Sequence, residues 1–245
     1  KEYIGEKYNA EKFIAYFQNF TNTYLPLNKL IQYVQEVEEV KDIVEVALST
    51  RPDCVNNIYL EKLQQVTQNQ TLSIELGLQT VNYHTLKKIN RKHTLAEFID
   101  AVLTARNNEV EVGVHLILNL PGDDMIDVIK NANILSSLKI DTVKLHALYI
   151  KENTEFGKKY QKGELEIISK DEYIERVITF LEYLNPDIAV QRLLGRAPED
   201  QTLFVNWGYG WGEIHNEIID KMKKRDTYQG RKYNYLQGKA LKKFE

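Results

Sequence analysis

Short apolar runs rich in β-branched residues recur along the chain, and the segments between them carry apolar residues at helical spacing. The runs start roughly 30 to 45 residues apart, which is typical of βα units on a parallel sheet. We therefore predict six strands joined by helices. They lie at residues 12–18, 43–49, 72–78, 110–118, 142–150 and 188–194.

Signals for the ends of helices stand between these strands. Thr94 and Ser169 are each followed three residues later by Glu, which is the spacing of a capping box. The pair Asn185-Pro186 should end the helix that Ser169 begins, because the residue before a proline disfavours helical backbone. Three further residues are candidate N-caps: Asn28, Asn82 and Asp123.

The side-chain pattern along the predicted strands distinguishes a barrel from an open sheet. Alternate residues of a strand face opposite sides, and here one set is apolar while the other contains polar and charged groups. A closed eight-stranded barrel fills its interior with Val, Ile and Leu, and a doubly wound sheet is apolar on both faces. We therefore predict an incomplete, splayed barrel with a polar ligand inside. The apolar set is Val44, Val46, Leu48, Ile74, Leu76, Leu78, Val112, Val114, Leu116, Val143, Leu145 and Ala147; the polar set is Glu45, Ser49, Glu75, Gln79, His115, Lys144 and His146.

No stretch rich in Gly, Ser or Pro divides the six strands. We therefore predict a barrel domain over residues 1–194 and a helical, basic appendage over residues 195–245 that packs on it. The basic character comes from residues 221–244, where lysines and arginines are interleaved with tyrosines. A solvated helix face is a commoner explanation for such a run than an RNA contact, and we favour it.

The composition describes a folded protein of nearly balanced charge. With 43% hydrophobic residues, 12 glycines and 5 prolines in 245 residues, the chain has the material for a core. The net charge of -3 gives no general attraction to nucleic acid or anionic lipid. The sequence contains no long apolar stretch and no signal-peptide pattern, so we expect a cytoplasmic location and no membrane partner.

Polar residues gather where the predicted strands end. Since parallel strands finish at one end of such a fold, these residues should come together there. Each group alone has an ordinary explanation as a turn or a core residue, but groups at the ends of all six strands predict a ligand site. They are Thr21, Asn22 and Thr23; Ser49, Thr50, Arg51, Pro52 and Asp53; Glu75, Gly77 and Gln79; His115, Asn119, Leu120, Pro121, Gly122 and Asp123; Lys144, His146 and Tyr149; and Gln191 and Arg192.

The sequence does not indicate a metal site, a nucleotide-phosphate site or a cysteine nucleophile. The chain has no Cys-x2-Cys, His-x3-His or EF-hand spacing, so we predict no metal ligands within it. It also has no Walker loop and no Gly-x-Gly-x-x-Gly turn. Cys54, the single cysteine, lacks a Gly-rich oxyanion signature, so a structural role is favoured over a Cys–His nucleophile pair.

Taken in order, the candidate segments resemble the radical S-adenosylmethionine (SAM) superfamily: FIAYFQNFTNTY, ALSTRPDC, IELGLQT with INRKHT, HLILNLPGD, VKLHALYI and QRLLG. The resemblance is nearest to YhcC-like bacterial proteins, which are related to the radical SAM domain of the elongator catalytic subunit. It implies an α/β fold, a partial (β/α)6 TIM-like barrel. In this superfamily a Cys-x3-Cys-x2-Cys loop holds a [4Fe-4S] cluster, which binds SAM and cleaves it to a 5′-deoxyadenosyl radical that abstracts hydrogen from a substrate.

The chain departs from this pattern because it contains one cysteine where the cluster needs three. Its first predicted strand resembles the family's second, and the sequence begins at Lys1 rather than Met. We therefore expect the first barrel strand and the cluster loop to precede Lys1, and the chain to be an enzyme core that is inactive by itself. The alternative is a degenerate relative, a SAM-binding or scaffold protein without radical chemistry. A barrel hydrolase or aldolase that uses Lys144 is disfavoured, since nothing indicates a desolvated amine there.

The resemblance also implies which residues contact SAM. Asn22 and Thr23 would lie at its amino-acid end, and Glu75 and Gln79 would contact it directly. Arg91, twelve residues after Gln79, would bind the SAM carboxylate, for which a guanidinium offers a planar fork.

Further matches surround the rest of the implied pocket. His115 would lie near the ribose. Pro121 and Gly122 match the family's Gly-Leu-Pro-Gly, in which Asn119 replaces the first Gly and would tighten the approach to adenine. The pocket floor would be lined or braced by Thr50, Arg51 and Asp53, and the substrate-side candidates are Lys144, His146 and Arg192. The catalytic residue and the substrate stay unassigned; tRNA is a weak candidate, and the electron donor would be a flavodoxin or ferredoxin.

Overall fold

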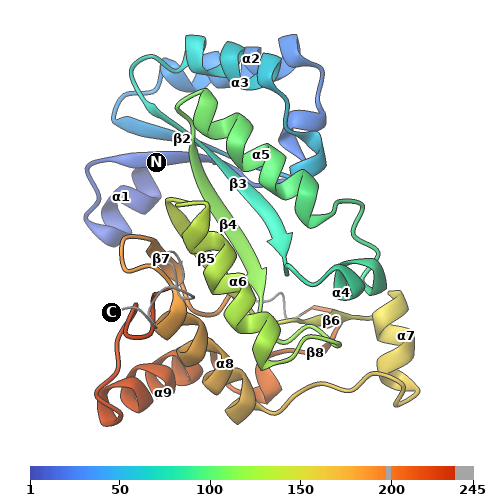
Figure 1. Cartoon of the computed structure of the whole chain (residues 1–245). Helices are drawn as coiled ribbons and strands as arrows, with labels where there is room; N and C mark the ends of the chain where they lie inside the picture. The colour runs from blue at the N-terminus through green and yellow to red at the C-terminus, as the bar shows by residue number, and fades with distance from the viewer. Residues whose placement is uncertain (197–199, 235–245) are drawn as a thin grey trace, which may run out of the picture. The chain divides into compact units, whose positions relative to one another are not determined.

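The computed structural model describes residues 1–196 and 200–234 (Figure 1). The chain divides into two compact units. Unit 1 comprises Lys1–Leu78 and His93–Val114, and unit 2 comprises Gln79–Lys92 and His115–Glu245. Two of the three crossings between the units fall inside strands, so the last residues of these two strands belong to unit 2.

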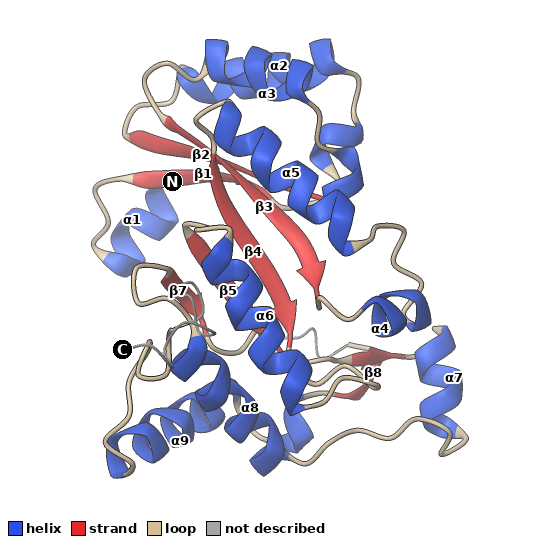
Figure 2. Cartoon of the chain, viewed as in Figure 1, coloured by secondary structure: helices blue, strands red, loops and turns tan. Residues whose placement is uncertain are grey.

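A six-stranded sheet holds its strands in the order β1-β2-β3-β4-β5-β7 (Figure 2). β1 pairs with β2, β2 with β3, and β5 with β7, each in parallel. A strand is found at each of the six predicted places, although the fifth is shorter than predicted. Their bounds are Phe13–Phe17 (β1), Ile43–Thr50 (β2), Thr71–Gln79 (β3), Glu111–Ile117 (β4), Thr142–His146 (β5) and Ala189–Arg192 (β7).

Unit 1 covers its strands with amphipathic helices. α2 contacts β2 and α3, and α3 contacts α5. α2 buries Leu30 and Val34, which lie four residues apart and therefore on one face of the helix. Each such side chain stabilises the fold by about 1.5–3 kcal/mol relative to exposure, and this packing holds the strand ends in place. The helices are α1 (Glu2–Tyr8), α2 (Leu27–Glu38), α3 (Asn57–Val66) and α5 (Leu95–Asn107), and two 3-10 turns follow β1 and β2: η1 (Asn22–Tyr24) and η2 (Pro52–Cys54).

Unit 2 is organised around α8, which packs against both α6 and α9. Tyr173 in α8 is fully buried. Arg225 donates two hydrogen bonds to Glu175 of α8, at 2.7 and 2.6 Å, and so ties the end of α9 to α8. The helices are α4 (Tyr83–Lys88), α6 (Met125–Ser137), α7 (Glu155–Gln161), α8 (Lys170–Tyr183) and α9 (Trp211–Lys224); a short antiparallel ribbon pairs β6 (Ile150–Lys151) with β8 (Thr202–Phe204), and the 3-10 turn η3 spans Asn206–Gly208.

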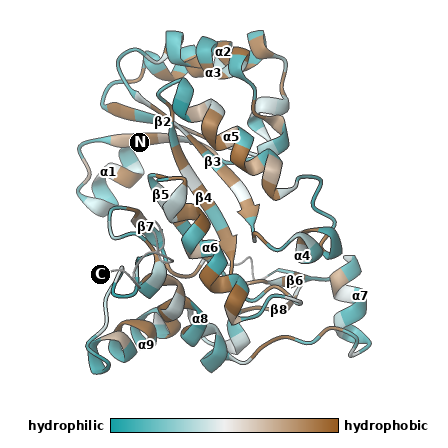
Figure 3. Ribbon diagram, in the orientation of Figure 1, coloured by the Kyte–Doolittle hydropathy of each residue, from teal (hydrophilic) through white to brown (hydrophobic). Residues whose placement is uncertain are grey.

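The predicted apolar face of the strands is buried with two exceptions. β3 and β4 contain many hydrophobic residues (Figure 3). Of these, Ile74, Leu76 and Leu116 have no exposed surface. Val44 is 39% exposed because it lies at the start of β2, before the buried part of that strand. Ala147 is half-buried and lies beyond the end of β5.

The prediction of one strand over residues 142–150 was wrong. β5 ends at His146, and Ile150 belongs to β6, where it pairs with Phe204 of β8. The physical reason is a hydrogen bond to a residue outside the sheet. The backbone N–H of Leu148 donates to the side-chain oxygen of Asn119 at 2.6 Å. This bond takes the backbone out of the sheet after β5.

The helix signals were confirmed in part. Thr94 forms the expected capping box, and Asn82 caps α4. Ser169 caps α8, which ends at Tyr183 ahead of Asn185-Pro186, but Glu172 bonds to Arg176 instead of to the cap. Two predicted N-caps were wrong: α2 begins after Pro26 rather than Asn28, and Asp124 caps α6 rather than Asp123. Asp123 is instead buried beside the hydroxyls of Thr80 and Thr85.

The predicted division at residue 194 stays a prediction. Of the proposed appendage, residues 197–199 and 235–245 lie outside the described part of the chain. Within the described ranges, no helix is long and apolar enough to cross a membrane.

Candidate functional site

Asn22 joins the ends of β1 and β2 in unit 1. It is buried in the turn that follows β1. Its amide nitrogen donates to the backbone oxygen of Phe17 at 2.7 Å and to that of Ser49 at 2.8 Å. The structure therefore gives Asn22 the contacts of a brace between two strand ends.

Thr23 and Thr50 extend this brace. Their hydroxyl oxygens are 2.5 Å apart, and both residues are buried. Arg51 donates from Nε to Asp53 Oδ1 at 2.9 Å, and its guanidinium also bonds the second carboxylate oxygen. These bonds hold the pKa of Asp53 below its usual range. Thr50 and Arg51 thus have the contacts of bracing groups, and their contact with SAM stays a prediction.

Glu75 of β3 is buried and accepts a hydrogen bond from the hydroxyl of Tyr16 at 2.7 Å. Between β2 and β3, the hydroxyl of Ser73 donates a hydrogen bond to the carboxylate of Glu45 at 2.5 Å. A buried carboxylate is stable only where such bonds or charges replace water. The polar face predicted for these strands therefore exists in unit 1 as a set of hydrogen-bonded acids.

Cys54 ends η2 and is partly exposed. Burial raises the pKa of its thiol, the Asp53 carboxylate raises it further, and Arg51 opposes both. The thiol is therefore not activated as a nucleophile or ligand. Within residues 1–196 and 200–234, no group of three or more His, Cys, Asp or Glu is placed to hold a metal ion.

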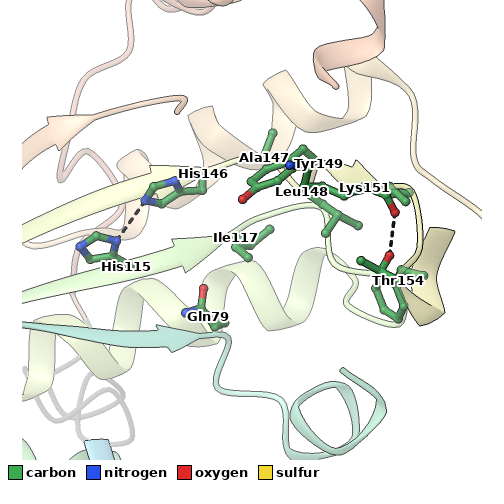
Figure 4. Close-up of a pocket in the computed structure, with 11 residues that line it drawn as sticks. Gln79, His115, Ile117, His146, Ala147, Leu148, Tyr149, Lys151 and Thr154 are labelled. Carbon is green, nitrogen blue, oxygen red and sulfur yellow. Dashed lines mark hydrogen bonds between the residues drawn. The ribbon is translucent and has the colours of Figure 1, made fainter. Parts of the chain in front are cut away.

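Unit 2 contains a pocket of about 450 Å³ (Figure 4). It brings together four predicted site residues. Three come from the ends of three strands, Gln79 of β3, His115 of β4 and His146 of β5, and the fourth, Tyr149, follows β5. Most of its walls are apolar. The lining residues are Gln79, His115, Ile117, His146, Ala147, Leu148, Tyr149, Ile150, Lys151, Thr154 and Phe156.

The two histidines of the pocket lie against each other. Their rings are stacked, with centroids 5.1 Å apart and planes inclined by 16°. His146 Nε2 lies 3.1 Å from His115 Nδ1, which is hydrogen-bonding distance (Figure 4). One ring can donate and the other accept while both are neutral, so the pair offers a fixed polar edge to a ligand.

Pro121, Gly122 and Asp123 follow β4. Gly122 has a φ of 113°, and a side chain there would approach the Thr85 hydroxyl at 3.1 Å, so this position requires glycine. Asp123 is buried, and burial raises the pKa of its carboxyl although the hydroxyls of Thr85 and Thr80 oppose this. The segment packs against the start of α4 within unit 2.

Asn119 connects the end of β4 to the pocket wall. Its side-chain oxygen accepts from Leu148 N at 2.6 Å, and Leu118 N donates to His146 O at 3.2 Å. Arg176 of α8 donates to Leu118 O at 3.0 Å. Asn119, predicted to tighten the approach to adenine, therefore has a structural contact that positions residues 146–148.

Nine predicted site residues of unit 2 do not line this pocket. Arg91 follows α4, and its backbone N–H donates to the backbone oxygen of Leu86 at 2.9 Å. Lys144 and Arg192 lie opposite each other in the register of β5 and β7. The others are Asn119, Leu120, Pro121, Gly122, Asp123 and Gln191.

Sequence reasoning missed the outer wall of the pocket, which comes from Lys151, Thr154 and Phe156. Thr154 caps α7 by accepting from Gly157 N at 2.9 Å, and its hydroxyl donates to Lys151 O at 2.8 Å (Figure 4). A Thr ahead of a helical pattern is a readable cap signal. β6 spans two residues, too few to show alternation.

Residues 1–135 match the sequence profile described as "Radical SAM superfamily". The chain belongs to this superfamily. Residues 140–224 match the profile described as "Radical_SAM C-terminal domain". The resemblance drawn from the sequence motifs is therefore confirmed.

Two uncharacterised relatives match most of the chain. The "Uncharacterized protein YtqA" of Bacillus subtilis is 32% identical over 237 residues, which cover 97% of this chain and 74% of that protein. The "Uncharacterized protein MJ0486" of Methanocaldococcus jannaschii is 33% identical over 230 residues, covering 93% and 71%. A more distant relative, the tRNA uridine(34) acetyltransferase of M. jannaschii, is 26% identical over 165 residues, covering 64% of this chain and 29% of the enzyme.

The fold is that of radical SAM proteins, an α/β half-barrel of six parallel strands. The structure of archaeal Elp3 from Methanocaldococcus infernus matches with a TM-score of 0.78 at 17% identity, covering 93% of this chain and 58% of that one. At this identity the likeness speaks for the fold alone. It confirms the predicted fold class, while the placing of a further strand before Lys1 stays a prediction.

Proposed function

We propose that this chain is the SAM-binding core of a radical SAM enzyme that removes hydrogen from its substrate. The observation that carries the proposal is the meeting of Gln79, His115 and His146 in one pocket at the ends of three strands. Folds with parallel strands bind their ligands at these ends, and membership of the superfamily supplies SAM as the expected ligand.

The pocket suits the adenosine part of SAM in size and chemistry. Its volume of about 450 Å³ lies in the range of small-molecule sites. Ile117, Leu148 and Tyr149 offer apolar contact to a flat base, and the paired imidazoles of His115 and His146 offer hydrogen bonds to ribose hydroxyls.

The charged end of SAM needs partners of both signs. We assign its carboxylate to Arg91, because a guanidinium binds a carboxylate through two parallel hydrogen bonds. Glu75, a buried carboxylate, is the proposed partner for positive charge on SAM. Asn22, Thr23, Thr50 and Arg51 would support the strand ends of unit 1 around the amino-acid part, and Pro121 and Gly122 would let backbone approach the nucleoside.

A [4Fe-4S] cluster does not fit the residues of this chain. The cluster takes three thiolates from its protein, and this sequence contains Cys54 alone. In proteins that hold it, the cluster supplies the electron that cleaves SAM to methionine and a 5′-deoxyadenosyl radical. The proposed reaction therefore needs at least two cysteines from outside these 245 residues and an electron donor such as flavodoxin or ferredoxin.

A SAM-binding or scaffold protein without radical chemistry is the second candidate. The single cysteine favours it, because SAM binding through side chains of the pocket does not need a cluster. The two candidates differ in iron content and in SAM cleavage, which can be measured directly.

The test uses the complete natural protein that contains this sequence, purified without oxygen and supplied with iron and sulfide. The enzyme proposal expects a cluster and the release of 5′-deoxyadenosine from SAM after reduction. Arg91→Ala should weaken SAM binding at least tenfold, Arg91→Lys should restore part of it, and Cys54→Ala should leave iron content and cleavage intact. SAM binding without a cluster would establish the SAM-binding form of the second candidate. A protein that does not bind SAM would overturn the enzyme proposal and leave only a scaffold.

We propose tRNA as the substrate class to test first, on the similarity to a tRNA-modifying acetyltransferase. The net charge of -3 gives no general attraction to RNA, so binding should depend on structure rather than on charge alone. Retention of tRNA on a filter, compared with an equal length of unstructured RNA, tests this. Equal retention of both would remove tRNA from consideration.

A further inference from the structure

Gln79, the pocket residue at the end of β3, has a backbone φ of 72°. This left-handed conformation is uncommon for residues with a side chain and needs support from its surroundings. The conformation decides in which direction the Gln79 side chain leaves the strand. Whatever holds the backbone here therefore also places an amide in the pocket.

The residues directly after Gln79 are fixed to α6. The backbone N–H of Val81 donates to Asn131 Oδ1 at 2.8 Å. Asn131 is 1% exposed, Val81 is 7% exposed, and Thr80 between Gln79 and Val81 has no exposed surface. A buried N–H needs a partner because water cannot replace it, and Asn131 is that partner.

A second bond runs in parallel one residue further on. The side-chain amide of Asn82 donates to Asp127 Oδ2 at 2.8 Å. Asn82 also accepts from the backbone of His84 and Thr85 and so begins α4. Asp127 and Asn131 lie four residues apart on α6, which puts both side chains on one face of the helix.

We propose that Asn131 is a positioning residue: its bond to Val81 holds the left-handed backbone at Gln79 and so directs the Gln79 side chain into the pocket. Asn131 does not itself line the pocket. Its influence on a ligand must therefore pass through the segment that follows β3. The binding part of this inference rests on the proposed function, since SAM is the ligand used to test it.

The test compares two variants of the 245-residue chain. Asn131→Leu removes the acceptor while keeping a similar volume, and Asn131→Asp keeps an acceptor oxygen in the same place. Hydrogen exchange of the amides of residues 79–83 should become at least tenfold faster in Asn131→Leu and stay close to wild type in Asn131→Asp. Unchanged exchange in Asn131→Leu would overturn the proposal. If Asn131→Leu does not fold, Asn131→Ala takes its place in every measurement.

SAM binding, measured by ligand-observed NMR, is a second readout. A general loss of structure would not reproduce the pattern expected for it. Asn131→Leu and Gln79→Ala should each weaken SAM binding. For Asn131→Leu we expect an affinity about tenfold lower, which corresponds to about 1.4 kcal/mol. In the Gln79→Ala background, Asn131→Leu should have no further effect, because the side chain that it positions is gone. Additive losses would show that Asn131 acts in another way.

The two proposals fail in different ways. A wild-type chain that does not bind SAM would count against the proposed function, while hydrogen exchange would still decide whether Asn131 holds this segment. Binding that is lost in Gln79→Ala but normal in Asn131→Leu would overturn only the role of Asn131.

Discussion

His115 and His146 are stacked with their ring centroids 5.1 Å apart, and the nitrogen atoms that face each other are separated by 3.1 Å. Gly195 lies against the far nitrogen of His146: a Cβ at position 195 would come within 2.8 Å of Nδ1. No side chain fits there unless the imidazole moves. The absence of a side chain at Gly195 is therefore part of what allows the histidine pair.

Gly195→Ala should displace His146 and disrupt this pair. Forcing a methyl group into a packed site typically lowers the free energy of unfolding by about 1–3 kcal/mol, which urea denaturation measures. Gly212→Ala in α9 is the matched control, because nothing lies within 4 Å of a Cβ there. The histidine ring resonances should shift in the first variant only. Equal behaviour of the two variants would contradict the crowding at Gly195.

The hydroxyls of Thr23 and Thr50 should be coupled in stability. Either Thr→Val change leaves the other hydroxyl buried without its partner at 2.5 Å, which costs about 1–3 kcal/mol. The double variant removes both groups and should cost less than the sum of the single changes. Urea unfolding of all four proteins completes the cycle. Strict additivity would mean that this bond does not stabilise the strand ends.

Local sequence pattern was sufficient to place the strands, because apolar side chains recur at every second residue along them. Ile74 and Leu76 of β3 are fully buried, and the alternation that contains them is visible in the sequence. The end of β5 had no such signal. It depends on the bond from Leu148 to Asn119, two residues 29 positions apart, and no periodicity encodes a single bond of that kind.

The candidate site shows the same difference. Gln79, His115 and His146 were predicted because they end strands, and strand ends meet in any fold of this type. The role of Asn131 was invisible in the sequence, since its partner Val81 lies 50 residues away and an asparagine within a helix carries no signal of its own. Packing between distant segments decides such contacts, and one sequence does not record it.

Cys54 should react slowly with thiol reagents, because burial and the Asp53 carboxylate raise its pKa and so lower the fraction of thiolate. Asp53→Asn removes the carboxylate and leaves the Arg51 cation unopposed, so the pKa should fall and alkylation at neutral pH should become faster. The rate of iodoacetamide labelling against pH measures this. Asp42→Asn, whose carboxylate bonds to Lys1 instead, is the control. An equal effect of both changes would rule out the local charge of Asp53 as the cause.

The buried carboxyl of Asp123 should make stability fall as pH rises. Burial and, to a smaller extent, Asp127 raise its pKa above the ordinary value of 3.8, while Thr85, Thr80 and Arg176 oppose the shift. The folded state therefore keeps its proton over a pH range in which the unfolded state has lost it. The resulting stabilisation is complete below the unfolded pKa and is lost as pH rises through the raised pKa.

Asp123→Asn cannot ionise and should lack this component. The free energy of unfolding of the wild type, minus that of the variant, should decrease from about pH 3.8 upward and level off above the folded pKa. Urea titrations of both proteins across this range give the difference directly, and effects of all other groups cancel in it. A difference that stays constant, or that grows with pH, would show that folding does not raise the pKa of Asp123.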